Sequence, residues 1–154
     1  MSTILFWIIY TVAAIWMQFF LPGPDFFVPA LLLCLQQNNL RVLAWLLLPW
    51  ILIQEGAGTL SFGTALLWYS GLIVFFNLVR HFFQTTALPF ILLFFSFAGC
   101  WYYLSIKLMA TLQDLHISKD MLLISSLKTA LILPLVWILL LAVYKRIFYS
   151  ETYV

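Results

Sequence analysis

Long apolar runs, separated by short polar or proline-containing breaks, fill almost the whole of this sequence. Of its 154 residues, 66% are hydrophobic and only 8% are charged. A soluble domain carries about 25% charged residues, and a chain this short could not bury so many apolar side chains by itself. The runs are continuous rather than alternating, which predicts spanning helices rather than barrel strands. We therefore expect an all-α, polytopic integral membrane protein.

The breaks divide the chain into six apolar runs, so we expect one domain over residues 1–154 that is a compact bundle of about six transmembrane helices, some short or broken. The second and third runs are shorter than the roughly 20 residues that a spanning helix needs, so each is either a half-helix or a steeply buried helix. Residues 108–120 are the most polar segment, which predicts the longest loop. The six runs cover approximately residues 4–21, 26–35, 42–53, 61–76, 87–106 and 121–144.

The first break, at residues 22–24, ends the first helix with two prolines and a glycine. Pro24 followed by Asp25 is typical of a helix start, so we expect the second helix to begin at Pro24 and to be kinked or loosened by Pro29. No lysine or arginine precedes the first run and no small-residue cleavage site follows it, which favours a retained helix over a signal peptide. Gln18, near the end of this run, is expected at the interface or bonded to a neighbouring helix.

Basic residues indicate the orientation of the helices. If both termini are cytoplasmic, four basic residues fall on the inner side and two on the outer side. The positive-inside rule favours this arrangement in the cell inner membrane. The inner residues would be Arg41, Arg80, Lys145 and Arg146, and the outer ones Lys107 and Lys119.

Residues 54–63 combine one of the chain's five acidic residues with three of its six glycines, between two apolar runs. Glu55 is either a carboxylate held near membrane depth or a loop carboxylate at the outer interface. Lys128, inside the last run, either forms an ion pair with Glu55 or Asp25, contacts a ligand carboxylate, or extends its amine to the interface. The glycines permit a bend with positive φ and close backbone approach, and they are Gly56, Gly58 and Gly63.

No constellation of residues indicates catalysis. The serines lack a histidine and a carboxylate at a recognisable spacing, and the two cysteines lie in apolar runs without a second type of metal ligand. The net charge of +2 is too small to indicate nucleic-acid binding. We therefore predict a protein that is not an enzyme and has no catalytic residues, cofactor or metal.

Two segments resemble the MreD family of rod-shape-determining membrane proteins. The family's second span opens with a Pro-Asp step before a leucine-rich run, as at Pro24-Asp25 and residues 26–33 here. A later apolar run leads to an acidic residue, a turn of small residues and a glycine followed by an aliphatic helix, as at Glu55 to Gly63. Glu55 stands where aspartate is common in the family. The resemblance covers roughly residues 1–80.

This resemblance implies an integral, non-catalytic component of the bacterial cell-elongation machinery. Such a protein would bind membrane lipid and a single-span MreC-like partner, and would help couple MreB filaments to peptidoglycan synthesis. It implies a groove for the partner helix, lined by small residues such as Ala57, Gly58, Gly63 and Ala65.

The family also looks similar in fold to the substrate-binding components of energy-coupling-factor transporters. The alternative function is therefore binding of a small, vitamin-like solute in a cavity into which Glu55, Lys128 or Trp101 points. An anchoring subunit of some other membrane complex is a third possibility.

Overall fold

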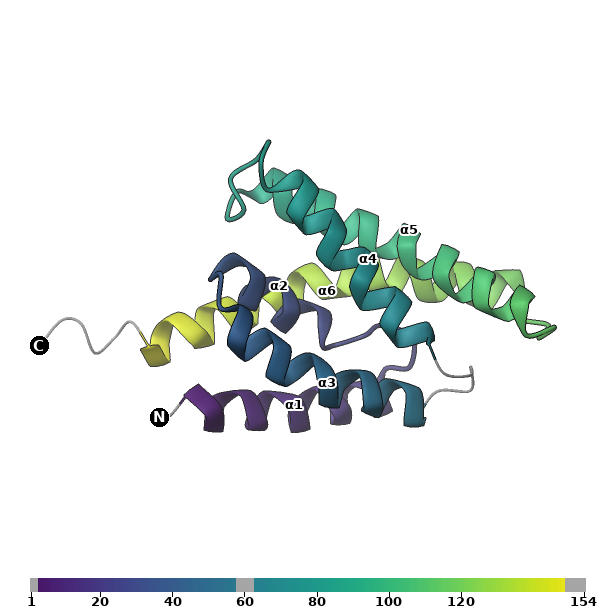
Figure 1. Ribbon diagram of the computed structural model, residues 1–154, viewed down its shortest axis with the longest axis horizontal. Coiled ribbons are helices and arrows are strands. Elements are labelled where there is room, and N and C mark those ends of the chain that lie inside the picture. The colour runs from purple at the N-terminus through teal and green to yellow at the C-terminus, as the bar shows by residue number, and fades with distance from the viewer. Residues whose placement is uncertain (1–2, 58–62, 149–154) are drawn as a thin grey trace, which may run out of the picture.

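The computed structural model describes residues 3–57 and 63–148, and every regular element in these ranges is a helix. Their order agrees with the six predicted runs (Figure 1). Three of the helices, α1, α5 and α6, are long and apolar enough to cross a membrane by length and composition, and α4 is apolar but shorter. The six are α1 (Thr3–Phe20), α2 (Val28–Gln36), α3 (Leu40–Ala57), α4 (Thr64–Val79), α5 (Leu88–Leu112) and α6 (Lys119–Phe148).

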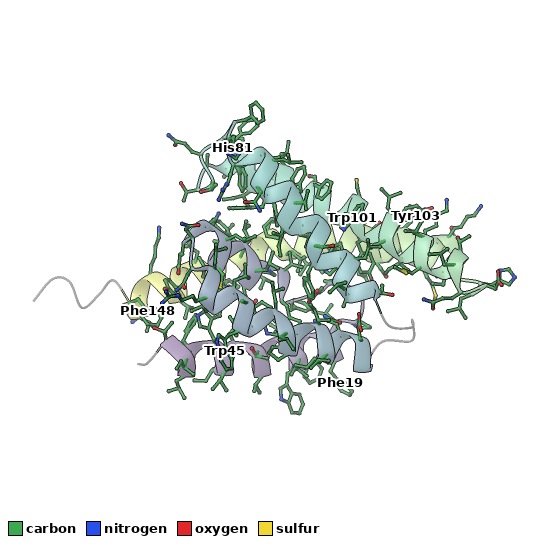
Figure 2. All side chains as sticks on the ribbon, in the orientation of Figure 1. Phe19, Trp45, His81, Trp101, Tyr103 and Phe148 are labelled. Carbon is green, nitrogen blue, oxygen red and sulfur yellow. The ribbon has the colours of Figure 1, made fainter. Side chains whose placement is uncertain are left out.

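Successive helices run in opposite directions through the bundle (Figure 1). The α2–α3 and α4–α5 connections therefore lie at one end, and the α1–α2 and α5–α6 connections lie at the other. Side chains join elements at the first end: the Tyr144 hydroxyl of α6 donates to Gln37 Oε1 at 3.0 Å, and Gln36 Nε2 donates to the Thr85 carbonyl at 2.6 Å. His81, in the α4–α5 connection, marks this end in Figure 2.

Helix α2 is the centre of the core. Its residues from Val28 to Leu35 are all buried, although the helix has only 9 residues. It packs against α3 and α6, and the ring of Phe27 just before it stacks on Trp50 of α3 with centroids 5.2 Å apart. The second apolar run is therefore a half-helix packed inside the bundle.

The start of α2 differs from the prediction. The helix begins at Val28 rather than at Pro24. Asp25 forms a turn just before it, in which its side chain accepts from the Phe27 amide and its backbone carbonyl accepts from the Val28 amide. Pro29 therefore lies in the first helical turn, where backbone amides have no intrahelical acceptor, so its missing N–H costs no helical hydrogen bond. It does not kink the helix interior.

Two other boundaries also differ. Helix α3 continues through Ala57, so Gln54, Glu55 and Gly56 are helical and do not form the predicted turn. Helix α5 continues through Leu112, which shortens the predicted loop over residues 108–120 to a connection over residues 113–118. In the polar segment the backbone bonds of the helix outweigh side-chain polarity, since Gln113 N still donates to the Met109 carbonyl.

Helices α5 and α6 form the most extensive helix pair and approach each other closely at Gly99. A Cβ atom at Gly99 would lie 2.9 Å from Ala130 Cβ and 3.0 Å from the Ser126 carbonyl oxygen. Small residues at such a crossing let two backbones pack directly. This pair supports the wall of the site described below.

Candidate functional site

A single buried carboxylate joins three parts of the bundle. Asp25, in the α1–α2 connection, is only 6% exposed and accepts five hydrogen bonds. Within the described ranges no cation pairs with it. Its Oδ1 atom accepts from Gln18 Nε2 (3.1 Å), Phe27 N (2.9 Å) and Gln54 Nε2 (2.9 Å), and its Oδ2 atom accepts from Trp68 Nε1 (2.9 Å) and Tyr69 Oη (2.6 Å). We call Asp25 and these five donors the Asp25 cluster.

The Asp25 cluster is arranged to hold an anion. Burial raises the pKa of Asp25 above its ordinary value, while hydrogen bonds, led by that from Tyr69, act in the opposite direction. All five contacts are donors, so the ionised carboxylate satisfies every one of them, whereas a protonated oxygen would compete with a donor. Multiple charge-assisted hydrogen bonds of this kind are the condition under which a buried charge is tolerated.

Helix α1 is attached to the core by the buried side chains Phe6, Trp7 and Ala14 and by a few polar contacts. The Tyr10 hydroxyl donates to the Phe26 carbonyl at 2.6 Å, and Trp50 Nε1 donates to Thr11 Oγ1 at 3.1 Å. Together with Gln18 these contacts place α1 beside the Asp25 cluster, although most of the helix surface is exposed. The predicted bond from Gln18 is thereby made, to the carboxylate of the next segment rather than to another helix.

A cavity of about 480 Å³ lies beside the Asp25 cluster. The α1–α2 connection, the end of α3, the start of α4, the second half of α5 and the region around the start of α6 all contribute to its walls. The polar and aromatic side chains that line it include Gln18, Asp25, Gln54, Glu55, Trp68, Tyr102, Ser105 and Ser125. The site is therefore a recess at one end of the bundle whose mainly apolar wall also contains several polar and aromatic side chains.

Glu55 lines this cavity from the last turn of α3. Its Oε1 atom accepts the Gly63 amide at 2.8 Å, and its Oε2 atom is buried with no hydrogen-bond partner in the described part of the chain. Gly63 precedes α4 with φ +108°, a backbone conformation that suits glycine. Glu55 thus holds the start of α4 with one oxygen, while its other oxygen is buried without a hydrogen bond to the described residues.

The predicted partnership of Glu55 with Lys128 is not formed. Lys128 is exposed on α6 and is not among the residues lining the cavity, and within residues 3–57 and 63–148 no ion pair joins it to either carboxylate. The reason is its position on the helix surface: Ser125, about one turn earlier, faces the cavity instead.

The structure brings together four of the seven residues singled out in the sequence. Pro24, Asp25 and Glu55 line the cavity, and Gly63 is bonded to Glu55. Gly56 is an exposed helical residue whose added Cβ would meet no described atom within 4 Å, so no close approach requires glycine there. Gly58 lies outside the described residues.

Gln54, Trp68 and Tyr69 are the functional residues that sequence reasoning missed. The sequence feature that could have identified them is their position, because each is a polar side chain inside or next to an apolar run. Buried amide, indole and phenol groups need hydrogen-bond partners. Within the described ranges, no group of three or more histidine, cysteine or acidic residues could hold a metal ion. Cys34 is buried and Cys100 exposed, both as free thiols.

Comparison of the sequence and structure with protein-family models, curated proteins and solved structures finds no match. The site must therefore be interpreted from its own geometry.

Proposed function

We propose that this chain is a multi-pass protein of the cell inner membrane with both termini in the cytoplasm. Three helices of spanning length and composition support the proposal, together with the exposed apolar surface of α1 and α6. The alternating helix directions put the first turn of α3, which contains Arg41, and the α4–α5 connection, which contains Arg80, at the same end as the last turn of α6. That last turn contains Lys145 and Arg146. This distribution supports a cytoplasmic assignment of that end.

Within that membrane, the protein acts as a non-catalytic component of the cell-elongation machinery, in the manner of the MreD family. One observation carries this proposal: the two segments that resemble the family meet at the Asp25 cluster. Asp25, from the Pro-Asp step, accepts a hydrogen bond from Gln54, whose neighbour Glu55 lines the same cavity. A sequence pattern whose two halves build one buried site supports common ancestry more strongly than apolar composition does.

The partner in this proposal is a single-span, MreC-like protein whose helix packs on α3. The surface of α3 around Pro49 has an apolar depression lined by Ala44, Trp45, Leu48, Pro49 and Leu52. Trp45 is 84% exposed there (Figure 2). Of the small residues expected to line a groove, Ala65 is buried and lines the cavity instead. The side chain of Ala57 and all of Gly58 lie outside the described residues.

Co-purification from membranes tests this role. The tagged chain should recover an MreC-like protein, and its depletion should change cell width. Trp45→Ala should reduce recovery of the partner, because it removes the largest exposed side chain of the depression. Trp16→Ala, which removes an exposed tryptophan from α1, is the matched control. Unchanged cell width together with no recovered partner would rule out the elongation role.

The cavity favours a second candidate function, binding of a small solute as in energy-coupling-factor transporters. Its volume lies within the roughly 300–1,000 Å³ of typical ligand sites, and Glu55 lines it as expected. Trp101 does not line it but donates to the Trp68 carbonyl at 3.2 Å. Recovery of an ATPase module, rather than an MreC-like protein, in the same purification would favour this function.

A further inference from the structure

Glu55, which lines the cavity beside the Asp25 cluster, has a buried carboxylate oxygen without a hydrogen-bond partner among the described residues. Asp25 already accepts five hydrogen bonds, so among the carboxylate oxygens of the described lining residues it is Glu55 Oε2 that has no hydrogen bond. Of the described residues that line the cavity, two are acidic and none is basic. A buried acceptor without a partner is costly, and a ligand that donates to it would remove that cost.

Aromatic and hydroxyl groups complete the lining. The rings of Trp68 and Tyr102 both line the cavity and meet edge to face with centroids 5.5 Å apart. Such rings attract cations, most strongly where water is excluded. Ser105 and Ser125 add hydroxyl groups to the wall. A cavity wall that combines an unpartnered carboxylate oxygen with aromatic rings is complementary to an ammonium group rather than to an anion.

We propose that this cavity binds the primary ammonium group of an amine, with Glu55 Oε2 accepting its N–H bonds and Trp68 and Tyr102 packing around it. A soluble amine and the headgroup of phosphatidylethanolamine carry the same group. The inference goes beyond the cell-elongation role and does not require it. If the solute-binding role holds, it names the chemical class of the solute.

Binding by the full chain in nanodiscs of phosphatidylglycerol tests the proposal in two arms. One arm adds soluble ethanolamine, and the other replaces part of the lipid with phosphatidylethanolamine. We expect a saturable rise in the unfolding temperature in at least one arm, and the arm that responds identifies the source of the amine. If neither arm responds, the proposal is wrong.

Glu55→Gln is the decisive variant, because glutamine keeps an oxygen for the Gly63 amide but loses the charge. It should weaken amine binding by about tenfold or more. Asp114→Asn, in the exposed α5–α6 connection, is the matched control and should bind as the parent does. Equal binding by Glu55→Gln and the parent would overturn the proposal.

A second variant tests the cavity without altering Glu55. Ser125→Leu places a larger side chain in the wall and should also weaken binding, whereas unchanged affinity would exclude this cavity as the site. The assay contains no partner protein, so its failure leaves the co-purification result, and with it the elongation role, unaffected.

Discussion

The Tyr69 hydroxyl donates to Asp25 Oδ2 at 2.6 Å, across 44 positions of sequence. Trp68 Nε1 donates to the same oxygen, so two hydrogen bonds connect α4 to the α1–α2 connection. Gln18 of α1 and Gln54 of α3 donate to the other oxygen, so one carboxylate fixes the relative positions of three helices.

Asp25→Asn should lower the free energy of unfolding by about 2–4 kcal/mol. The substitution preserves size, but the asparagine amide nitrogen is a donor and would face other donors. Thermal unfolding of the purified chain in detergent measures the loss. Asp120→Asn, at an exposed position in the first turn of α6, is the control and should cost far less. Equal unfolding temperatures for the two variants would show that the Asp25 cluster does not stabilise the bundle.

Gly99→Ala should destabilise the α5–α6 pair by about 1–3 kcal/mol, because the added methyl group would press on the Ala130 side chain and the Ser126 backbone. Gly56→Ala provides an internal comparison. Its methyl group meets no described atom within 4 Å, and alanine favours the helix by up to about 1 kcal/mol. The two variants should therefore shift the unfolding temperature in opposite directions, and shifts of the same sign would contradict the packing described at Gly99.

Tyr10→Phe should cost about 1 kcal/mol by removing the hydroxyl that donates to the Phe26 carbonyl. Tyr103→Phe is the control, since Tyr103 is half-buried on α5 and its ring lies under the Lys107 amine, a contact that phenylalanine retains. Unfolding temperature is again the measurement. A larger loss for Tyr103→Phe than for Tyr10→Phe would be inconsistent with the attachment of α1 described above.

Lys128→Gln should change stability by no more than about 0.5 kcal/mol, because the side chain is exposed and makes no ion pair with Glu55. The test is a double-mutant cycle with Glu55→Gln, monitored by thermal unfolding. A coupling energy near zero is expected. A coupling energy of several kcal/mol would show instead that Lys128 and Glu55 form the ion pair predicted from the sequence.

The sequence predicted the order of the helices because the breaks between them depend on local chemistry. Proline and glycine at residues 22–24 end α1, and the polar residues 37–39 separate α2 from α3. The shortness of the second run indicated that α2 could be packed inside the bundle. Glu55 and Asp25 were identified because a carboxylate in such a chain needs a specific environment.

The donors around Asp25 could not be predicted in the same way. Helix α4 is apolar around most of its circumference, so no stripe indicates which side faces inward. The contacts of Trp68 and Tyr69 with Asp25 depend on how α4 is rotated and on a pairing across more than 40 residues. The ion pair predicted for Lys128 was wrong for the same reason. Ser125 of α6 lines the cavity while Lys128, about one turn later, is exposed, and the sequence does not indicate which of these positions meets the cavity.

The separation of Asp25 from its donors also has a consequence for biosynthesis. At a synthesis rate of about 5–20 residues per second, the 44 residues that separate Asp25 from Tyr69 take roughly two to nine seconds to make. During that interval the nascent chain contains a carboxylate whose Oδ2 donors do not yet exist. The α1–α2 connection can therefore reach its final environment only after α4 has been synthesised, so the first helix cannot be fixed in place before the fourth.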